Sequence, residues 1–493
     1  MQLRISGLPR AVKAMAALLP AAAMLSLAPA AGAAGVAAAG LPLPLPTVSD
    51  FQLLSTSTTP PSEADCFSVN RRCFTPLSMS NSYNLGPLYT HGFKGQGQTV
   101  AIIDSFGDPN IASDLHTFSN AFGLPNMCGE TGVTCAAGMP TFQHVYFNGK
   151  TVVKTPPPGS NGTGTQARNG WALETALDVE WVHSIAPKAN IIDLTTNPAE
   201  TLGVQGFPAM MNAEQYVVDN HLATVISQSF AAAEQTFAST QSLLNLRHAF
   251  ISAAANGVTV LGSSGDNGTA NTTFTPVKNP TVFPFPTVEW PASDPLVTGV
   301  GGTYLCTDPT TGLTVDSTDP PGKCQKNPDV REIGWIAGGG GFSSVFGAPD
   351  YQAGFVPAGS GRGVPDVSYQ ASATTGVLVY DTAPGATGIN CPSGNPCSSG
   401  WYVVGGTSSS APQWGAIVAI ADQYAGHGLG LINPTLYKIA SNPAEYAADF
   451  HDVTTGNNQL DPSVPGYSAG VGWDPVTGLG TPNAANLVPD LAG

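Results

Sequence analysis

Residues 99–104 have the sequence Thr-Val-Ala-Ile-Ile-Asp, an apolar run of strand length that ends on a carboxylate. Apolar residues at helical spacing follow at 111–122, and the same alternation of strand and helix recurs downstream. It predicts further strands at 189–194, 223–229 and 258–263, and helices at 171–185, 208–220 and 239–256. Strands that alternate with helices need crossover connections and form a mainly parallel sheet with helices on both faces. We therefore predict an α/β fold.

The remaining segments carry weaker signals. Residues 140–170 form a Pro-, Gly- and Asn-rich stretch that predicts a loop, and residues 270–400 are loop-rich with many prolines. Residues 35–75 are rich in Ala, Pro, Ser and Thr and lack sustained periodicity, so we expect a loosely draped N-terminal extension. No repeat or linker divides residues 76–493, which we treat as one domain.

The first 34 residues have the pattern of a secretory signal peptide. Arg4, Arg10 and Lys13 precede an apolar Ala/Leu-rich run at 14–28, and Ala-Gly-Ala at 31–33 is a suitable cleavage site. No later stretch is apolar and long enough to span a membrane. We expect a secreted, extracellular protein.

The eight cysteines support export. They fall into four close pairs, which predict four local disulfides: Cys66/Cys73, Cys128/Cys135, Cys306/Cys324 and Cys391/Cys397. A zinc site is disfavoured because the sequence has no Cys-x-x-Cys and no histidine at ligand spacing beside these pairs.

Composition narrows the class of partner. Charged residues make up 10% of the chain and the formal net charge is −16, against a usual charged fraction of ~25%. So few cations argue against binding to nucleic acid or to anionic membranes. A surface poor in ionisable groups suits an acidic working environment, although an ordinary acidic secreted protein has the same composition.

Residues 405–412 have the sequence Gly-Gly-Thr-Ser-Ser-Ser-Ala-Pro and open an apolar segment of helical length. Small residues let the backbone turn sharply, and Ser408 would sit at a helix N-terminus, where developing negative charge is favoured. Ser408 is therefore a candidate nucleophile. The alternative is a Ser-rich N-cap on a buried helix.

Two further segments place carboxylates in informative positions. Glu174 and Asp178 are four residues apart on a largely apolar helix with no cation at i±4, so they should share a proton. The alternative is that both face solvent. Asp266 lies in a Gly-bounded loop after the strand at 258–263, at the edge of the sheet where ligands bind. The alternative there is a simple Asp-Asn-Gly turn.

The C-terminal region contains two Gly-rich segments with carboxylates, at 452–456 and 470–474. Asp452 and Asp474, together with carbonyls freed by glycines, offer oxygen ligands for a hard cation such as Ca²⁺. The spacing is not that of an EF-hand, and a pair of turns is the alternative.

Taken in chain order, the segments that carry Glu174 and Asp178, Asp266, Ser408, and Asp452 with Asp474 resemble the sedolisin (serine-carboxyl peptidase) family. The resemblance covers about residues 75–493. The specific matches are Glu174-x-x-x-Asp178, Ser-Gly-Asp266-x-Gly and Gly406-Thr407-Ser408, with supporting matches at 186–187, 290–293, 300–303, 339–343, 349–352 and 364–368. The resemblance implies a subtilisin-like three-layer fold with a central mainly parallel sheet. It also implies an acid-acting endopeptidase or tripeptidyl-peptidase.

The resemblance implies a role for each residue. Ser408 is the nucleophile, Glu174 the general base and then acid, Asp178 the residue that orients Glu174, and Asp266 the oxyanion donor. One structural Ca²⁺ is implied at the side chains of Asp452 and Asp474 and the carbonyls of Val453, Gly470 and Gly472. The chemistry is consistent, because a carboxylate titrating near 4 still accepts a proton at a pH where histidine, with a pKa of ~6.5, is already protonated.

Two features depart from the family pattern. Only about 40 residues separate the predicted signal from the catalytic region, where the family usually carries a long pro-domain. The strand at 225–229 is followed by Phe230-Ala231 in place of Trp/Tyr-Gly, which bears on substrate preference because this strand should pair with the substrate backbone.

Two other functions compete with the peptidase. A Ser-His-Asp enzyme of subtilisin type would use Asp104, but no histidine lies in a His-Gly-Thr-His context. A non-catalytic secreted binding or surface protein on the same fold is the other. For the peptidase we expect protein or peptide substrates, no nucleic-acid or membrane partner, and a monomer.

Overall fold

The computed structural model describes residues 45–46, 48–155, 165–196, 206–273, 281–317, 322–383 and 399–493. These residues belong to one compact unit that spans residues 40–493. The predicted signal peptide lies outside the described residues, as do Cys391 and Cys397.

A nine-stranded sheet forms the centre of this unit, in the order β13-β12-β10-β8-β4-β7-β5-β6, with β16 paired to β12. Its parallel strands are β4 (Thr99–Ser105), β5 (Phe142–Phe147), β7 (Asn190–Thr196), β8 (Val225–Gln228), β10 (Thr259–Ser263), β12 (Thr298–Leu305) and β16 (Val367–Gln370). The outer strands β6 (Val152–Val153) and β13 (Glu332–Gly334) pair antiparallel. The predicted mainly parallel sheet is confirmed.

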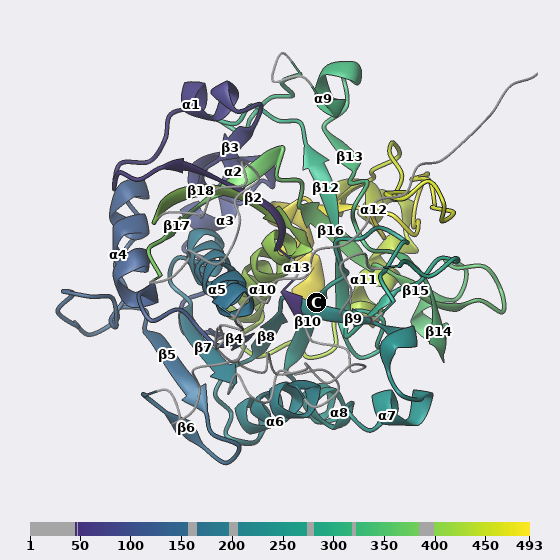
Figure 1. Cartoon of the computed structure of the whole chain (residues 1–493), viewed down its shortest axis with the longest axis horizontal. Coiled ribbons are helices and arrows are strands. Elements are labelled where there is room, and N and C mark those ends of the chain that lie inside the picture. Colours follow the sequence, from purple (N-terminus) through teal and green to yellow (C-terminus); the bar gives the residue numbers. More distant parts are fainter. Residues whose placement is uncertain are drawn as a thin grey trace, which may run out of the picture. The chain divides into compact units, whose positions relative to one another are not determined.

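Both faces of the sheet are covered by helices. Alternate residues of each strand point to opposite faces, so apolar strands need a packing partner on each side. Val100 and Ile102 of β4 pack into one core with α5 (Thr165–Ile185) and α10 (Thr407–Ala425). Ala101 and Ile103 pack into a second core with α6 (Gly206–Asp219) and α8 (His248–Ala255). Figure 1 shows α5 beside α10 and α6 beside α8. This three-layer arrangement is the predicted α/β fold.

The predicted helix at 239–256 is interrupted. It consists of α7 (Thr240–Leu244) and α8, with a break at residues 245–247. Arg247 lies at the break and forms two hydrogen bonds with Asp294, of 2.5 and 2.8 Å. The spacing of apolar residues in a helix does not predict an ion pair with a distant segment, so the break was not expected.

A second, four-stranded sheet corrects the expectation for residues 48–75. Its order is β2 (Val48–Ser55), β18 (Gly400–Gly406), β17 (Thr375–Asp381) and β3 (Arg72–Phe74). Between β2 and β3 lies α1 (Glu63–Ser68). These residues are therefore not loosely draped: β2 pairs with a strand about 350 residues away and packs Phe51 and Leu53 against the core. Local periodicity does not predict a partner so distant.

The segments expected to be loops also contain short elements that pair at long range. Residues 140–170 include β5, β6 and the start of α5, and the described part of 270–400 includes the seven strands β11 to β17, which pair with distant residues or one another. Those not yet named are β11 (Glu289–Trp290), β14 (Gly341–Gly347) and β15 (Gly361–Val364). The other elements are α2 (Pro76–Ser82), α3 (Gly86–Thr90), α4 (Ile111–Phe122), α9 (Lys323–Lys326), α11 (Asn433–Ala440), α12 (Pro443–Asp449), α13 (Ala484–Ala492), β1 (Leu45–Pro46), β9 (Phe230–Ala233), β19 (Phe450–His451) and β20 (Thr481–Pro482).

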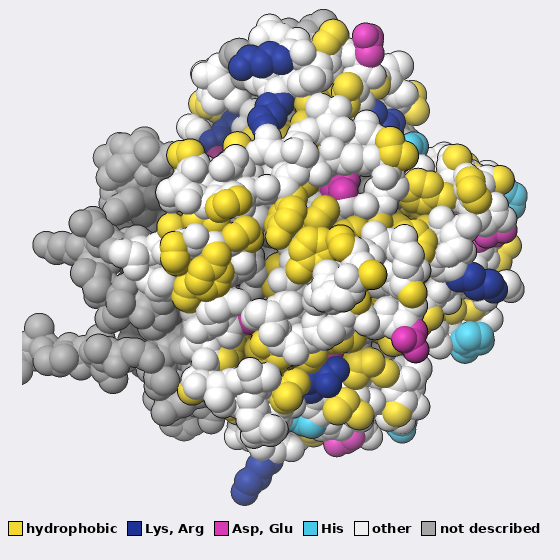
Figure 2. Space-filling view, turned by 90° about the vertical axis from the view of Figure 1, so that its right-hand side faces the viewer, with side chains coloured by type: hydrophobic (Ala, Val, Ile, Leu, Met, Phe, Trp, Pro, Cys, Tyr) yellow, Lys and Arg dark blue, Asp and Glu magenta, His cyan; other side chains and the backbone are white. Residues whose placement is uncertain are grey.

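Three of the four predicted disulfides are present: Cys66–Cys73, Cys128–Cys135 and Cys306–Cys324. Within the described ranges, no helix combines the length and apolarity needed to cross a bilayer. Figure 2 shows charged side chains scattered singly over one face, with uncharged surface between them, as the 10% charged fraction leads one to expect.

Candidate active site

Ser408 lies where β18 turns into α10. Gly406 precedes the helix with φ +141°, a backbone conformation that suits glycine, and Thr407 and Ser408 form the first turn of α10. Both side chains are fully buried. Ser408 therefore sits at the N-terminal, positive end of a 19-residue helix.

Helix α5 brings Glu174 and Asp178 to Ser408. Both carboxyls are fully buried, so the alternative in which they face solvent is wrong. Burial raises the pKa of Glu174 well above its ordinary value, Asp104 raises it further, and hydrogen bonding with Ser408 lowers it. Burial and Glu174 also raise the pKa of Asp178, whose Oδ1 accepts a 3.0 Å hydrogen bond from Ser229. The two carboxyls therefore titrate as a pair.

Two members of this cluster were not predicted as site residues. Asp104, at the end of β4, is fully buried, and its Oδ2 accepts a 3.0 Å hydrogen bond from Thr175. Burial and the nearby Asp193 raise its pKa. Ser229 follows β8 directly. The only sequence signal for either residue was its position at the carboxyl end of a parallel strand.

Asp266 is joined to the start of α10. Its Oδ1 accepts hydrogen bonds of 2.8 Å from both the backbone N–H and the hydroxyl of Thr407, the residue before Ser408. Gly265 donates its N–H to the same Thr407 hydroxyl at 3.1 Å. These bonds place the 263–268 loop beside the start of α10, next to Ser408, so it is more than an isolated turn.

Glu289 of β11 also faces this loop and was missed by the sequence reasoning. A Cβ added at Gly265, where φ is +106°, would lie 2.1 Å from Glu289 Oε2, so only glycine fits there. Burial, and then the charge of Asp266, raise the pKa of Glu289 to about 8. The site thus combines a buried serine with five buried or nearly buried carboxyls.

Comparison with known proteins gives consistent relatives, although no protein-family model matches the chain. Kumamolisin from Bacillus sp. (strain MN-32) is 32% identical over 444 residues, which cover 87% of this chain and 65% of kumamolisin. Tripeptidyl-peptidase SED1 from Arthroderma otae is 32% identical, covering 76% of this chain and 57% of its own length. Human tripeptidyl-peptidase 1 is 30% identical, with coverages of 66% and 53%.

The fold agrees with a solved structure of Pseudomonas sedolisin, a serine-carboxyl proteinase complexed with two molecules of pseudo-iodotyrostatin. The TM-score is 0.60 at 24% identity, and the match covers 85% of this chain and 98% of that chain.

The chain belongs to the sedolisin family. It spans between about half and two thirds of the length of the curated relatives described above.

In this chain an N-terminal segment lies against β9, which follows the strand at 225–229 that we expected to pair with substrate. Strand β9 directly follows Ser229, and β1 pairs with it antiparallel, Leu45 opposite Ala231 and Pro46 opposite Phe230. On its other side β9 pairs with β11, which carries Glu289. Both edges of β9 are therefore paired, and β8 lies between β4 and β10, so an extended substrate backbone could add to β9 only in place of β1.

The five predicted calcium ligands come from neighbouring loops. Gly472 N–H donates to Asp452 Oδ2, and Gly470 N–H donates to Asp474 Oδ2, both at 3.0 Å. Asp452 Oδ1 is buried and accepts no hydrogen bond within the described part of the chain. Burial raises the pKa of Asp474 to about 6. A buried carboxylate oxygen without a donor fits a cation site.

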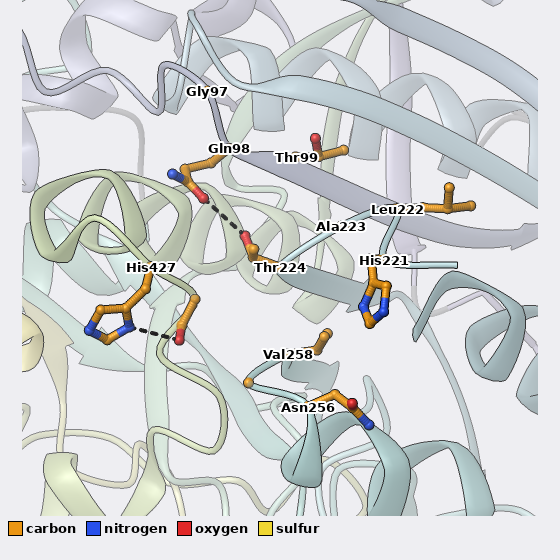
Figure 3. Close-up of a pocket in the computed structure, with 12 residues that line it drawn as sticks. Gly97, Gln98, Thr99, His221, Leu222, Ala223, Thr224, Asn256, Val258 and His427 are labelled. Atoms are coloured by element: carbon orange, nitrogen blue, oxygen red, sulfur yellow. Dashed lines mark hydrogen bonds between the residues drawn. The ribbon is translucent and has the colours of Figure 1, made fainter. Parts of the chain in front are cut away.

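A pocket of about 410 Å³ opens elsewhere, and none of the predicted site residues lines it. Figure 3 shows it between His221, Thr224, Val258 and His427, with a hydrogen bond from Thr224 to Gln98. These residues flank the starts of β4, β8 and β10. The pocket therefore lies at the opposite edge of the sheet from Glu174, Asp178 and Asp266, so it is not the site built above.

Proposed function

We propose that this protein is a secreted, acid-acting serine-carboxyl peptidase that hydrolyses peptide bonds in proteins or peptides. The observation that carries the proposal is the assembly around Ser408. Its hydroxyl interacts with Glu174, Asp178 lies one turn away on the same helix, and Asp266 is bonded to Thr407. These are the groups that an acyl transfer at low pH needs.

In the proposed reaction, Ser408 Oγ attacks the scissile carbonyl carbon while its proton passes to Glu174. Asp266, protonated, donates a hydrogen bond to the oxyanion, as a neutral buried carboxylic acid can. Glu174 then gives its proton to the leaving amine, which departs as the C–N bond breaks. A water molecule attacks the acyl-enzyme, loses its proton to Glu174, and the ester bond to Ser408 breaks as Glu174 returns the proton.

The pH range follows from the coupled carboxyls. Glu174 must lose its proton to act as a base, and Asp178 and Asp104 make that harder by their negative charge. At low pH, Asp178 keeps a proton and can hold it in a hydrogen bond toward Glu174, which leaves one negative charge for the pair. A histidine in the place of Glu174 would be cationic at that pH and unable to accept a proton.

We infer three supporting features. Phe230 and Ala231, which follow the strand at 225–229, bear on the choice of substrate. One Ca²⁺ is bound by Asp452, Val453, Gly470, Gly472 and Asp474 and stabilises the C-terminal loops, without a part in the chemistry. The protein is an extracellular monomer without nucleic-acid or membrane partners, in keeping with disulfides that form in oxidising compartments.

The test is digestion of a peptide library at pH 3–5 with the wild type, Ser408→Ala and Glu174→Gln. The wild type should cleave, and its products will distinguish endopeptidase from tripeptidyl-peptidase action. Both variants should be folded and inactive. Cleavage by Ser408→Ala at the wild-type rate would contradict the proposal, and a folded wild type that cleaves nothing would favour the non-catalytic binding protein.

A further inference from the structure

A second group of buried carboxyls lies outside the proposed active site. Asp108, in the loop between β4 and α4, and Asp114, in the first turn of α4, meet Asp381 at the end of β17. One oxygen of each lies within 4.8 Å of the others, and the three side chains are no more than 2% exposed. We propose that this cluster, completed by Glu180 of α5, is a second Ca²⁺ site, separate from the loops at Asp452 and Asp474.

The spacing suits calcium. Ca²⁺ takes six to eight oxygen ligands at about 2.3–2.6 Å, so ligand oxygens on opposite sides of the ion are separated by roughly 4.6–5.2 Å. Mg²⁺ holds its ligands at about 2.0–2.1 Å and prefers to keep several waters. Three buried carboxylate oxygens within 4.8 Å of one another are compatible with Ca²⁺, and a buried site leaves little room for the waters that Mg²⁺ keeps.

Backbone amides hold the three carboxyls in place. Asp108 Oδ1 accepts the N–H of Asn110, and Asp381 Oδ1 accepts that of Ala383, both at 2.7 Å. Asp114 Oδ2 accepts the N–H of Thr382, also at 2.7 Å, and its Oδ1 accepts the hydroxyls of Thr382 at 2.6 Å and Ser113 at 3.4 Å. At Asp108 and Asp381 the backbone bond fixes one oxygen, and a carboxylate so fixed still has lone pairs on its other oxygen for a cation.

Two oxygens at this cluster have no hydrogen-bond donor within the described residues. Asp108 Oδ2 and Glu180 Oε1 are both buried and accept no bond. The other oxygen of Glu180 accepts the N–H of Tyr380 at 3.0 Å, which places this carboxyl beside Asp381, and its charge acts on all three aspartates. A buried acceptor without a partner is costly, and a bound cation would satisfy both oxygens.

Charge balance points the same way. Within the described ranges no lysine or arginine forms an ion pair with any of the four carboxyls. The other titratable groups that act on them or lie close by are Asp193, itself bonded to His144, and the phenols of Tyr146, Tyr380 and Tyr402. Four buried carboxylates without a counterion would repel one another strongly, so they must bind protons or a cation.

A Ca²⁺ ion at this site would connect elements that support the proposed active site. It would join α4, β17 and α5, the helix that carries Glu174 and Asp178. It would thus stabilise the position of α5 against its neighbours.

The test counts bound Ca²⁺ in the full chain carrying Ser408→Ala, which prevents self-digestion. Equilibrium dialysis at pH 6.5 against micromolar Ca²⁺, with metal analysis, should give two ions per chain. Asp381→Asn in this background should retain one, Asp452→Asn one, and the double variant none. Asn at position 381 can still accept the Ala383 N–H, so the local fold is kept. Asp461→Asn, which changes a surface aspartate that accepts the Ser463 N–H at 2.8 Å, should still bind two.

The proposal is overturned if Asp381→Asn binds as much Ca²⁺ as its parent, or if Asp452→Asn alone removes every ion. If the parent binds one ion, its loss in Asp381→Asn supports the site and its loss in Asp452→Asn overturns it. Asp108→Asn, with Tb³⁺ luminescence excited through tyrosine and tryptophan, repeats the test should Asp381→Asn fail to fold. None of these readouts requires peptidase activity.

Discussion

Helix α5 contributes to two groups of buried carboxyls that differ in what surrounds them. Around Glu174 and Asp178 the neighbours are hydroxyl groups, from Ser408, Ser229 and, through Asp104, Thr175. Around Asp108, Asp114 and Asp381 the donors are backbone N–H groups of the same loops, together with the hydroxyls of Ser113 and Thr382 on Asp114. The first group is next to Ser408, the proposed nucleophile, and the second is not.

The type of hydrogen-bond donor determines what a buried carboxyl can do. A hydroxyl can donate to a carboxylate and then lose its own proton to it, so the first group suits proton transfer. A backbone N–H donates without giving up its proton, so it fixes one oxygen and leaves the other for a cation. Burial raises the pKa in both groups, and the partner decides between catalysis and ion binding.

The largest expected effect tests whether Ser408 and Glu174 take part in catalysis. Ser408→Ala and Glu174→Gln should each lower kcat/KM for a fluorogenic peptide at pH 4 by about 10⁴-fold or more, as removal of a triad member does. Thermal unfolding should remain cooperative in both variants. Activity of either variant within tenfold of the wild type would contradict the catalytic role of the replaced residue.

The role of Asp266 is tested by the difference between two replacements. Asp266→Ala should reduce kcat by about 10²–10³-fold with little change in KM, the usual effect of losing an oxyanion donor. Asp266→Asn should retain more activity, because its amide can donate while its oxygen accepts from Thr407. Equal losses in the two variants would mean that Asp266 only anchors Thr407.

A smaller effect is expected at Ser229, whose hydroxyl stabilises the ionised form of Asp178 across 3.0 Å. Ser229→Ala removes that bond, so the pKa of the coupled pair should rise, and the acid limb of the kcat/KM profile should move up by about one pH unit. Ser227→Ala, a buried serine two residues earlier on the same strand, is the matched control. A shift in the control as large as in Ser229→Ala would count against the hydrogen bond as the cause.

The smallest effect concerns stability at neutral pH. Because burial raises the pKa of Glu289 from 4.5 to about 8, the folded chain keeps a proton that the unfolded chain releases near 4.5. Stability from this group is therefore full below about pH 4.5 and lost as the pH rises to 8. Tm measured from pH 4 to 8 should fall less steeply by a few degrees in Glu289→Gln. Parallel curves would show that the group does not stay protonated in the fold.

The predicted secondary structure succeeded where a single run of residues carries the pattern. Strands β4, β7, β8 and β10 are short apolar runs, and the 171–185 helix holds Glu174 and Asp178 at a spacing that fixes their common face. Strand β2 was missed because its partner β18 is about 350 residues away and only one of its edges is paired. The split between α7 and α8 was missed because it is stabilised by an ion pair to Asp294.

The site residues also divide into those that local sequence motifs predicted and those that they did not. Ser408, Glu174, Asp178 and Asp266 were chosen from local motifs, and the structure brings them together. Asp104, Ser229 and Glu289 have no local motif beyond a position at a strand end. The Asp108–Asp114–Asp381 cluster joins residues about 270 positions apart, so no spacing in the sequence could predict it.

The sequence by itself determined the alternation of strands and helices, the three local disulfides that the structure describes, and the four residues proposed for catalysis. Each depends on neighbours a few residues apart, where spacing sets geometry. Only the tertiary structure decided which carboxyls are buried together, which partners they have, and that residues 48–55 form a strand beside β18. Burial and pairing depend on segments hundreds of residues away, and the pKa of a carboxyl follows from that burial.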